Sequence, residues 1–186
     1  MRLFVAVHLS EEIRARLATL QDRLRRAQAD VSWVKPGNLH ITLKFLGETE
    51  PRRLDRIRPA LADAAQGAVA FAAEVAGVGT FGGRIPRVVW VGVRDGATPL
   101  TALARAVEDA LAGMGVAKEK RGFTAHFTLG RVRSPTNLEA LLAALRAEPA
   151  EGFGTVRVDQ FSLMESELNP SGSIHTVRDR FSLRSA

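Results

Sequence analysis

The order of apolar and polar residues predicts short strands that alternate with helices. Brief apolar or alternating runs between turn residues are typical of strands. Apolar residues three and four apart, as at Ile13, Leu17, Leu20 and Leu24, are typical of a helix with one buried face. The expected strands are residues 3–9, 31–34, 39–46, 69–78, 87–93, 124–132, 155–164 and 174–183. The expected helices follow the cap candidates Ser10, Thr49, Thr98 and Thr136 and run to about residues 24, 66, 111 and 146.

These elements form two sets with the same order: strand, helix, strand, helix, strand. Leu3 and Val89 are 86 positions apart, as are His40 and His126, and the cap candidates of the two sets differ by 87 or 88. A nearly constant offset through five elements indicates an internal duplication, with two similar lobes related by an approximate two-fold. We therefore predict one compact domain with two lobes. The domain spans residues 1–186, and its lobes are roughly residues 1–83 and 84–186.

The strongest feature of the duplication is a four-residue motif, His-apolar-Thr-Leu, at residues 40–43 and 126–129. Side chains alternate between the two faces of a strand, so the His and Thr of each copy share one face. Two such strands side by side would place two imidazoles and two hydroxyls around one small space. The alternative is a pair of core histidines bonded to neighbouring threonines, but the duplication favours a site. The candidate residues are His40, Thr42, His126 and Thr128.

Composition restricts the partners. A content of 46% hydrophobic and 25% charged residues is ordinary for a soluble globular protein. The net charge of +6, with a basic loop at Lys118, Lys120 and Arg121, favours an anionic partner such as RNA or a nucleotide, or only improves solubility. There is no cysteine, and no apolar run approaches the roughly 18 residues of a membrane span. We expect a cytoplasmic protein with no membrane partner and no obligate protein partner.

Two other site types are less favoured. Residues 77–82 match the glycine pattern of a dinucleotide-binding loop, but a strand follows them instead of the helix that such a loop requires. Histidines can also bind metal. Each motif, however, offers a single histidine and no carboxylate lies in the flanking strands, whereas divalent metals usually need more ligands of these types. We expect neither a metal nor another cofactor.

Paired histidines suit acid–base chemistry at neutral pH, because one imidazole can accept a proton while the other donates one. Hydrolysis of a phosphodiester needs this pairing, with one group activating water and the other protonating the leaving oxygen. Threonine hydroxyls can donate hydrogen bonds to the nonbridging oxygens. A strained 2′,3′-cyclic phosphate is a suitable target.

The two motifs and their flanking sequences resemble the 2H phosphoesterase superfamily. More narrowly, the chain is similar to the bacterial and archaeal RNA 2′,3′-cyclic phosphodiesterases, historically called 2′-5′ RNA ligases. The likeness covers nearly the whole chain. The segments that carry it are MRLFVAVHL, WVKPGNLHITLKFLGE, RVVWVGV, FTAHFTLGRV and FSLMESELNPSGSIHTVRDRFSL.

This resemblance implies an α+β fold with two lobes of mainly antiparallel sheet, helices on the outside and a central cleft. It implies metal-independent hydrolysis of RNA 2′,3′-cyclic phosphate ends to a 2′-phosphomonoester. It also implies that His40 and His126 are catalytic, with His40 protonating the leaving 3′ oxygen, although the residues alone leave the two roles open. The implied phosphate-binding residues are Thr42, Thr128 and Arg131.

The strand pattern does not by itself direct the Arg131 side chain towards the site. By strict alternation it points away from Thr128, so a role in the site requires Gly130 to permit a bulge or strand end. Without such a bulge, Arg131 is an ordinary surface arginine.

Several residues near the motifs have less defined roles. Lys44 shares the face of Thr42, where it lends charge to the cleft or lies at a solvated strand end. Phe45, with the opposite parity, is expected in the core. His8 is expected to be structural, and His175, where other family members often carry tyrosine, is expected to be a packing or surface residue. Two further aromatic residues are expected in the core: Trp33 and Trp90.

Two alternative functions use the same fold. One is a non-catalytic RNA-binding module, which would have no evident need of two proton-transfer groups. The other is 2′-5′ RNA joining in the same site, which has little driving force because the chain has no nucleotide-activation motif. For the phosphodiesterase, which we favour over both alternatives, the expected partner is RNA with a 2′,3′-cyclic phosphate end, or a cyclic nucleotide.

Overall fold

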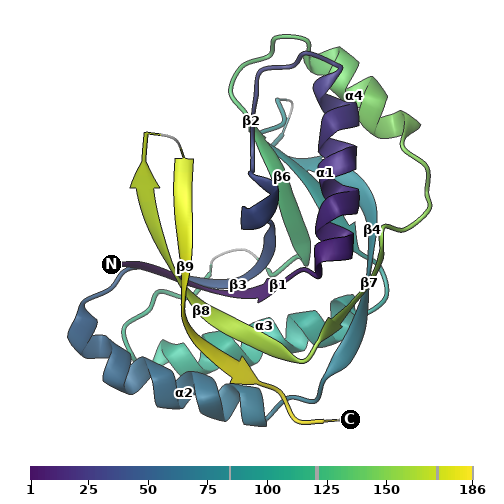
Figure 1. Ribbon diagram of the computed structural model, residues 1–186. Helices are drawn as coiled ribbons and strands as arrows, with labels where there is room; N and C mark the ends of the chain where they lie inside the picture. Colours follow the sequence, from purple (N-terminus) through teal and green to yellow (C-terminus); the bar gives the residue numbers. More distant parts are fainter. Residues whose placement is uncertain (84, 120–121, 171, 186) are drawn as a thin grey trace.

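The computed structural model describes residues 1–83, 85–119, 122–170 and 172–185, so Lys120 and Arg121 of the expected basic loop lie outside it. The fold is α+β, as expected (Figure 1). Its strands are β1 (Arg2–His8), β2 (Val31–Trp33), β3 (His40–Glu48), β4 (Phe71–Phe81), β5 (Val88–Val93), β6 (His126–Val132), β7 (Gly154–Val158), β8 (Gln160–Asn169) and β9 (Gly172–Ser182). Its helices are α1 (Glu11–Arg25), α2 (Leu54–Gln66), α3 (Ala97–Ala112) and α4 (Leu138–Ala147), with 3₁₀ turns η1 (Pro36–Asn38) and η2 (Pro51–Arg53).

The strands form one curled antiparallel sheet in the order β7-β4-β5-β6-β3-β1-β8-β9, and β2 pairs with β6 beside this path. The two motif strands are neighbours at the centre, where Ile41 pairs with Phe127. Because β3 and β6 run antiparallel, His40 lies opposite Thr128 and Thr42 lies opposite His126. The sheet therefore brings the two motifs together.

The third strand of each predicted repeat crosses to the other half of the sheet. β4 pairs with β5 and β7, and β8 pairs with β1 and β9. Each half of the sheet thus contains strands from both repeats, so the halves are not continuous in sequence. The duplication, with a boundary near residue 83, stays a prediction about the sequence.

The helices lie on the outer side of the curled sheet and leave its concave side open (Figure 1). α1 packs with α4 and β7, whereas α2 and α3 pack with each other and with β9 and β3. The apolar stripe of α1 is buried as expected, and Ile13, Leu17, Leu20 and Leu24 are each at most 2% exposed. Among the described residues, no helix combines the length and apolarity needed to cross a bilayer.

One of the four expected helix caps is confirmed. Ser10 caps α1, and its hydroxyl accepts a hydrogen bond of 3.3 Å from the backbone N–H of Ile13. α3 and α4 instead begin after Gly96 and Asn137, which both have positive φ and make no side-chain cap bond. α2 begins after η2. The three candidates that do not cap a helix are Thr49, Thr98 and Thr136.

Two segments differ from expectation because of pairing with distant strands. Residues 77–81 of the glycine-rich segment continue β4, and Gly79 pairs with Trp90. A Cβ at Gly79 would lie 2.5 Å from the Trp90 ring, so the glycine leaves room for that ring. The strand expected at 155–164 is two strands, because β7 pairs with β4 and β8 pairs with β1.

Both motif strands carry a one-residue bulge at the leucine of the motif. On β3, Thr42 pairs with Ala6 and Lys44 with Val5, which leaves Leu43 as the extra residue. On β6, Thr128 pairs with Trp90 and Gly130 with Val89, which leaves Leu129 extra. The bulge at Gly130 that Arg131 requires is therefore present. Since a strand has a period of two, each bulge reverses the direction of the side chains directly after it. On β3 a second register shift, at Leu46, follows before Gly47.

The registers also revise one offset of the repeat. Val5 on β1 and Val89 on β5 occupy the same place relative to the motif strands, and they are 84 residues apart. The sequence comparison matched Val89 to Leu3, two residues away. Both positions are buried apolar residues, so an alternating pattern does not distinguish them.

The bulge of β6 is held by the N-terminal part of the chain. The carbonyl oxygen of Leu129 accepts hydrogen bonds from the Val34 backbone N–H at 2.8 Å and from Gln21 Nε2 at 2.9 Å. Gln21 is fully buried and also donates to the Val34 carbonyl oxygen at 2.8 Å. These bonds satisfy a carbonyl group that the bulge removes from the regular ladder.

We predict that Gly130→Ala destabilises the protein by roughly 1–3 kcal/mol, since a Cβ there would lie 2.5 Å from Val31 Cγ1 and 3.0 Å from Trp33 Cε3. Urea unfolding measures the change in free energy. Gly113→Ala is the matched control, because a Cβ there has open space and its φ of −67° suits alanine. Equal stability of the two variants would contradict the close approach of β2 to the bulge.

Candidate active site

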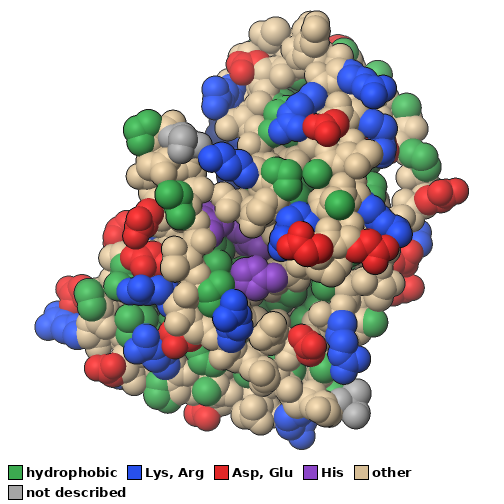
Figure 2. Space-filling view, viewed as in Figure 1, with side chains coloured by type: hydrophobic (Ala, Val, Ile, Leu, Met, Phe, Trp, Pro, Cys, Tyr) green, Lys and Arg blue, Asp and Glu red, His purple; other side chains and the backbone are tan. Residues whose placement is uncertain are grey.

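The two motifs line one cleft on the concave side of the sheet, with a volume of about 1440 Å³. Figure 2 shows histidines at the bottom of a hollow in this face. All of the site residues expected from the sequence line the cleft: His40, Thr42, His126, Thr128 and Arg131.

His40 is held in one tautomer by two neighbours in the sequence, Asn38 of η1 and Thr42 of β3. Its Nδ1 donates to the carbonyl oxygen of Asn38 at 2.7 Å, which leaves Nε2 to accept from the hydroxyl of Thr42 at 3.0 Å. Burial lowers the pKa of His40 to about 4, an effect that the Asn38 bond opposes. Three other histidines, His175, His8 and His126, add to the lowering of this pKa. In the free protein His40 is therefore a neutral imidazole at physiological pH.

His126 is held in the same way. Its Nδ1 donates to the carbonyl oxygen of Thr124 at 2.7 Å, two residues earlier, as in His40. Burial lowers its pKa, the bond to Thr124 raises it, and the charge of Arg131 lowers it further. In both motifs Nδ1 is thus held by a backbone carbonyl, which leaves Nε2 as the ring nitrogen that can exchange a proton with a substrate.

An aromatic ring contacts each of these histidines. Phe4 of β1 stacks on His40 with ring centroids 4.8 Å apart. Phe81 of β4 meets His126 edge to face at 4.9 Å and also stacks on Trp90. These contacts restrict the rotation of the imidazoles, so both are preorganised before a ligand arrives.

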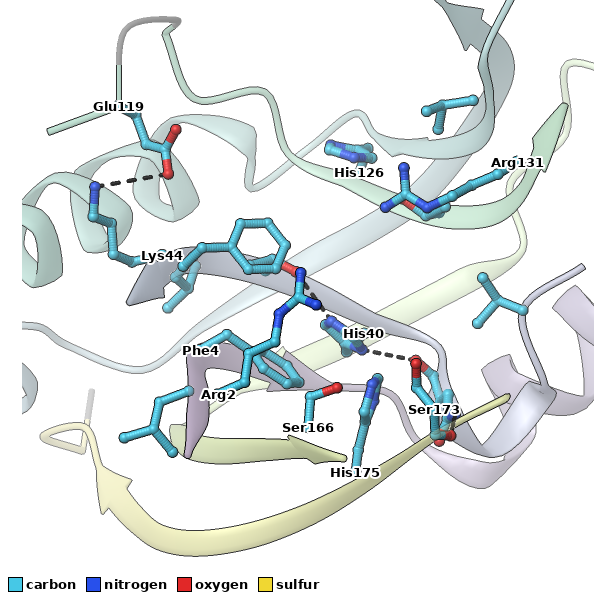
Figure 3. Close-up of a pocket in the computed structure, with 18 of the residues that line it drawn as sticks. Arg2, Phe4, His40, Lys44, Glu119, His126, Arg131, Ser166, Ser173 and His175 are labelled. Carbon is cyan, nitrogen blue, oxygen red and sulfur yellow. Dashed lines mark hydrogen bonds and ion pairs between the residues drawn. The ribbon is translucent and has the colours of Figure 1, made fainter. Parts of the chain in front are cut away.

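The bulge turns Arg131 into the cleft. Figure 3 shows its guanidinium next to His126, and the side chain is exposed and lines the cleft. Strict alternation would have turned it away, as discussed above. Its position suits an anion bound between the two histidines.

The same bulge on β3 overturns the core position expected for Phe45 and the solvated position expected for Lys44, although Lys44 is among the residues that line the cleft. Lys44 is turned into the protein, where its side chain is 1% exposed and Nζ bonds Glu108 Oε1 at 2.8 Å and the Ala117 carbonyl oxygen at 2.6 Å. The ion pair with Lys44 lowers the pKa of Glu108. Phe45 is 54% exposed and lines the cleft. Alternation failed for both because it did not include the extra residue, Leu43.

The comparisons with known proteins agree with this arrangement. The 2′-5′ RNA ligase superfamily, as a sequence family, matches residues 9–170. The chain belongs to this superfamily. The resemblance to the 2H phosphoesterases that the two motifs indicated is confirmed.

Several members of the superfamily are similar over nearly the whole chain. A protein of Methanothermobacter thermautotrophicus named RNA 2′,3′-cyclic phosphodiesterase is 37% identical over 184 residues, which are 98% of this chain and 99% of that protein. One of the same name from Archaeoglobus fulgidus is 38% identical over 176 residues, 94% of this chain and 96% of that protein.

Solved structures confirm the fold class. A protein of Thermus thermophilus has a TM-score of 0.82 at 30% identity, and the match covers 100% of this chain and 99% of that protein. E. coli LigT in complex with 3′-AMP has a TM-score of 0.81 at 25% identity, and the match covers 98% of this chain and 97% of that protein.

One residue of the site, His175, was missed by sequence reasoning. His175 on β9 lines the cleft, and its ring centroid is 5.3 Å from that of His40 and 5.0 Å from that of Phe4. His8 pairs with His40 across β1 and β3. The four histidines of the chain therefore gather on one face, although only two belong to the motif. Alternation along β9, once paired with β8, is the signal that could have found His175.

The two tryptophans expected in the core are only half-buried. Trp33 is half-buried, packs against the main core and also lines the cleft, where Arg25 lies 5.5 Å over its ring. Trp90 is half-buried and packs against Gly79 and Phe81, behind His126.

We predict that His40 makes folding stability depend on pH between about 4 and 6.5. Its folded pKa is lowered, so in this window the unfolded chain binds more protons, and stability falls as pH falls from 6.5 towards 4. Above 6.5 its contribution is constant. His40→Gln should reduce the loss of unfolding free energy across this window by roughly 1–3 kcal/mol.

Urea unfolding at several pH values measures this difference, and NMR titration of the His40 ring, identified by its absence in His40→Gln, checks the pKa directly. A ring that titrates near 6.5 would contradict its burial as a neutral group.

Proposed function

We propose that this protein hydrolyses RNA 2′,3′-cyclic phosphate ends to 2′-phosphomonoesters, with His40 and His126 as proton-transfer groups and without a metal. The observation that carries the proposal is the pairing of two imidazoles, each in the same tautomer and each beside a motif threonine, across one cleft. The superfamily and the names of the relatives support the substrate class.

The reaction needs one neutral and one protonated imidazole. Both have lowered pKa values in the free protein, but an anionic phosphodiester between them favours the charged form and raises both. One imidazole takes a proton from water as its oxygen attacks phosphorus. The bond from phosphorus to O3′ breaks, and the other imidazolium gives its proton to O3′. A proton exchange with solvent restores the starting state.

The motif threonines respond to this change of charge. In the free protein the Thr42 hydroxyl donates to His40 Nε2. When Nε2 is protonated it can no longer accept, so the hydroxyl is released to donate to a nonbridging phosphate oxygen. Thr128 has the same place beside His126, and Arg131 supplies a full positive charge to the same anion.

The ligand in this reading is the 3′ end of an RNA chain. Phe45 and Phe123 line the cleft beyond His126, and an exposed aromatic ring is suited to stacking on a nucleobase. E. coli LigT, which shares the fold, has been solved with 3′-AMP, a nucleotide of the size that this part of the cleft would receive.

We predict that His40→Ala and His126→Ala each slow hydrolysis of an oligonucleotide 2′,3′-cyclic phosphate by about 10²–10⁴-fold, because each removes one proton-transfer group. Phosphorus NMR follows the cyclic phosphate and shows whether the 2′- or 3′-phosphomonoester forms, with the 2′ product expected. Circular dichroism and urea unfolding serve as controls that both variants fold. Full turnover in either folded variant, or RNA binding without turnover by the wild type, would disprove the proposal.

We also predict that dialysis against EDTA leaves the rate of hydrolysis unchanged, because the imidazoles, hydroxyls and Arg131 supply the proton transfers and the charge that the reaction needs. The measurement is the initial rate before and after chelation, with added Mg²⁺ or Zn²⁺ as the matched condition. A rate that collapses with EDTA and returns with one of these ions would disprove metal independence.

A further inference from the structure

The two bulges give the cleft different chemistry at its two ends. Arg131 follows the bulge of β6 as Phe45 follows the bulge of β3, so these residues hold equivalent positions in the two motif strands. Because the strands are antiparallel, the two positions lie at opposite ends of the cleft. We name the end lined by Ser32, Lys35, Asn38, Arg131, Arg133 and Ser173 the basic arm. The end lined by Phe45, Phe123, Arg105, Glu108 and Glu119 is the aromatic arm.

The cations of the basic arm are free to bind a ligand. Lys35, Arg131 and Arg133 are exposed, and within the described part of the chain none of them has a carboxylate within ion-pair distance. Figure 2 shows Lys and Arg side chains along the upper rim of the hollow that holds the histidines. A surface of unpaired cations beside an anion-binding centre is suited to a polyanion.

On the side of the aromatic arm three of the described cations are already paired, and one, Arg2, which lies opposite Glu48 and lines the cleft, has no ion pair. Lys44 bonds Glu108, and both Arg105 and Lys118 lie near Asp109, at 3.7 Å and 3.9 Å. A second phosphate on this side would meet carboxylates that already neutralise these cations. The charge distribution therefore distinguishes the two directions in which a nucleic acid could leave the centre.

The structure of the ribose requires the base and the upstream chain to lie at different ends of the cleft. In a 2′,3′-cyclic phosphate, C2′ is bonded to C1′, which carries the base, and C3′ is bonded to C4′, which carries the 5′ side of the chain. The base and the upstream chain therefore leave the sugar in opposite directions along the C2′–C3′ edge. A site that holds the cyclic phosphate at its centre must receive the base at one end and the upstream chain at the other.

We propose that the upstream phosphodiesters of a single-stranded RNA end lie along the basic arm, held by Lys35 and Arg133, while the terminal base enters the aromatic arm. This direction rests on the proposed function. The β8–β9 hairpin forms the facing wall of the basic arm, where Asn38 Nδ2 bonds the carbonyl oxygen of Ser173 at 2.8 Å. Leu168 of this hairpin is 71% exposed and lines the cleft, which suits contact with upstream bases.

The direction also orders the two histidines along the substrate. The chain passes from Lys35, before η1, through His40 at the start of β3 to Phe45, and His126 lies opposite Thr42, nearer the aromatic arm. O3′ lies on the side of the upstream chain and therefore beside His40, and the attacking water lies on the side of His126. This arrangement agrees with the role of His40 as proton donor to the leaving 3′ oxygen that the family resemblance implies.

The test compares two substrates with one pair of variants. Lys35→Ala/Arg133→Ala should raise KM for an oligonucleotide 2′,3′-cyclic phosphate about tenfold at low salt, since two exposed ionic contacts are lost. The slope of log kcat/KM against log salt for that substrate should fall by roughly 1.4, about 0.7 for each lost contact. For a 2′,3′-cyclic mononucleotide, which has no upstream phosphodiester, kcat and KM should stay as in the wild type.

Arg105→Ala/Lys118→Ala is the matched control, because it removes the same charge from the aromatic arm, and it should leave the KM of the oligonucleotide nearly unchanged. Three results would overturn the assigned direction while the mononucleotide is still hydrolysed. These are an unchanged oligonucleotide KM in Lys35→Ala/Arg133→Ala, equal effects on both substrates, and an equal effect of the control variant. A wild-type protein that hydrolyses neither substrate would overturn the proposed function and the direction together.

Discussion

The site depends on one constraint, the extra residue that each central strand accommodates directly after its motif threonine. A strand alternates its side chains strictly, so one additional residue reverses all that follow. At Leu43 and Leu129 two consecutive residues face inward, and the next side chain, Phe45 or Arg131, returns to the cleft. A bulge interrupts the ladder, and on β6 Gln21 and Val34 supply the hydrogen bonds that Leu129 would otherwise lack. The cleft thus gains a cation at one end and an aromatic ring at the other.

The crossed topology joins the two repeats in one sheet. β4 and β8 each pair in the half of the sheet opposite to their own repeat, so each half is built from strands of both repeats, and the halves meet where β3 pairs with β6. The motif strands sit at the centre of this sheet with a paired strand on each side. A site that must hold two imidazoles at a defined separation benefits from such a frame, because the histidines are positioned before substrate binds.

The two motif strands share the contacts that hold their histidines but differ in the side chains that follow the bulge. The bond from His Nδ1 to the carbonyl two residues earlier and the contact with a phenylalanine ring occur in both motifs. Beyond the bulge the copies diverge, with Lys44 in the place of Gly130 and Phe45 in the place of Arg131. Equivalent backbones therefore carry different side chains, as required for a ligand whose two ends differ.

Local patterns determined much of this protein. The apolar stripe of α1, the Ser10 cap, the strand period around each motif and the repeated His-apolar-Thr-Leu were enough to predict alternating strands and helices and a centre of two histidines and two threonines, whereas the α+β class with a central cleft came from the family resemblance. All of these signals act within a few residues of the chain. The tertiary structure alone decided the direction of Phe45 and Lys44, the presence of His8 and His175 beside His40, and the crossing of β4 and β8. Each of these depends on the register between strands distant in sequence, and an alternating pattern stays the same when that register shifts by two residues.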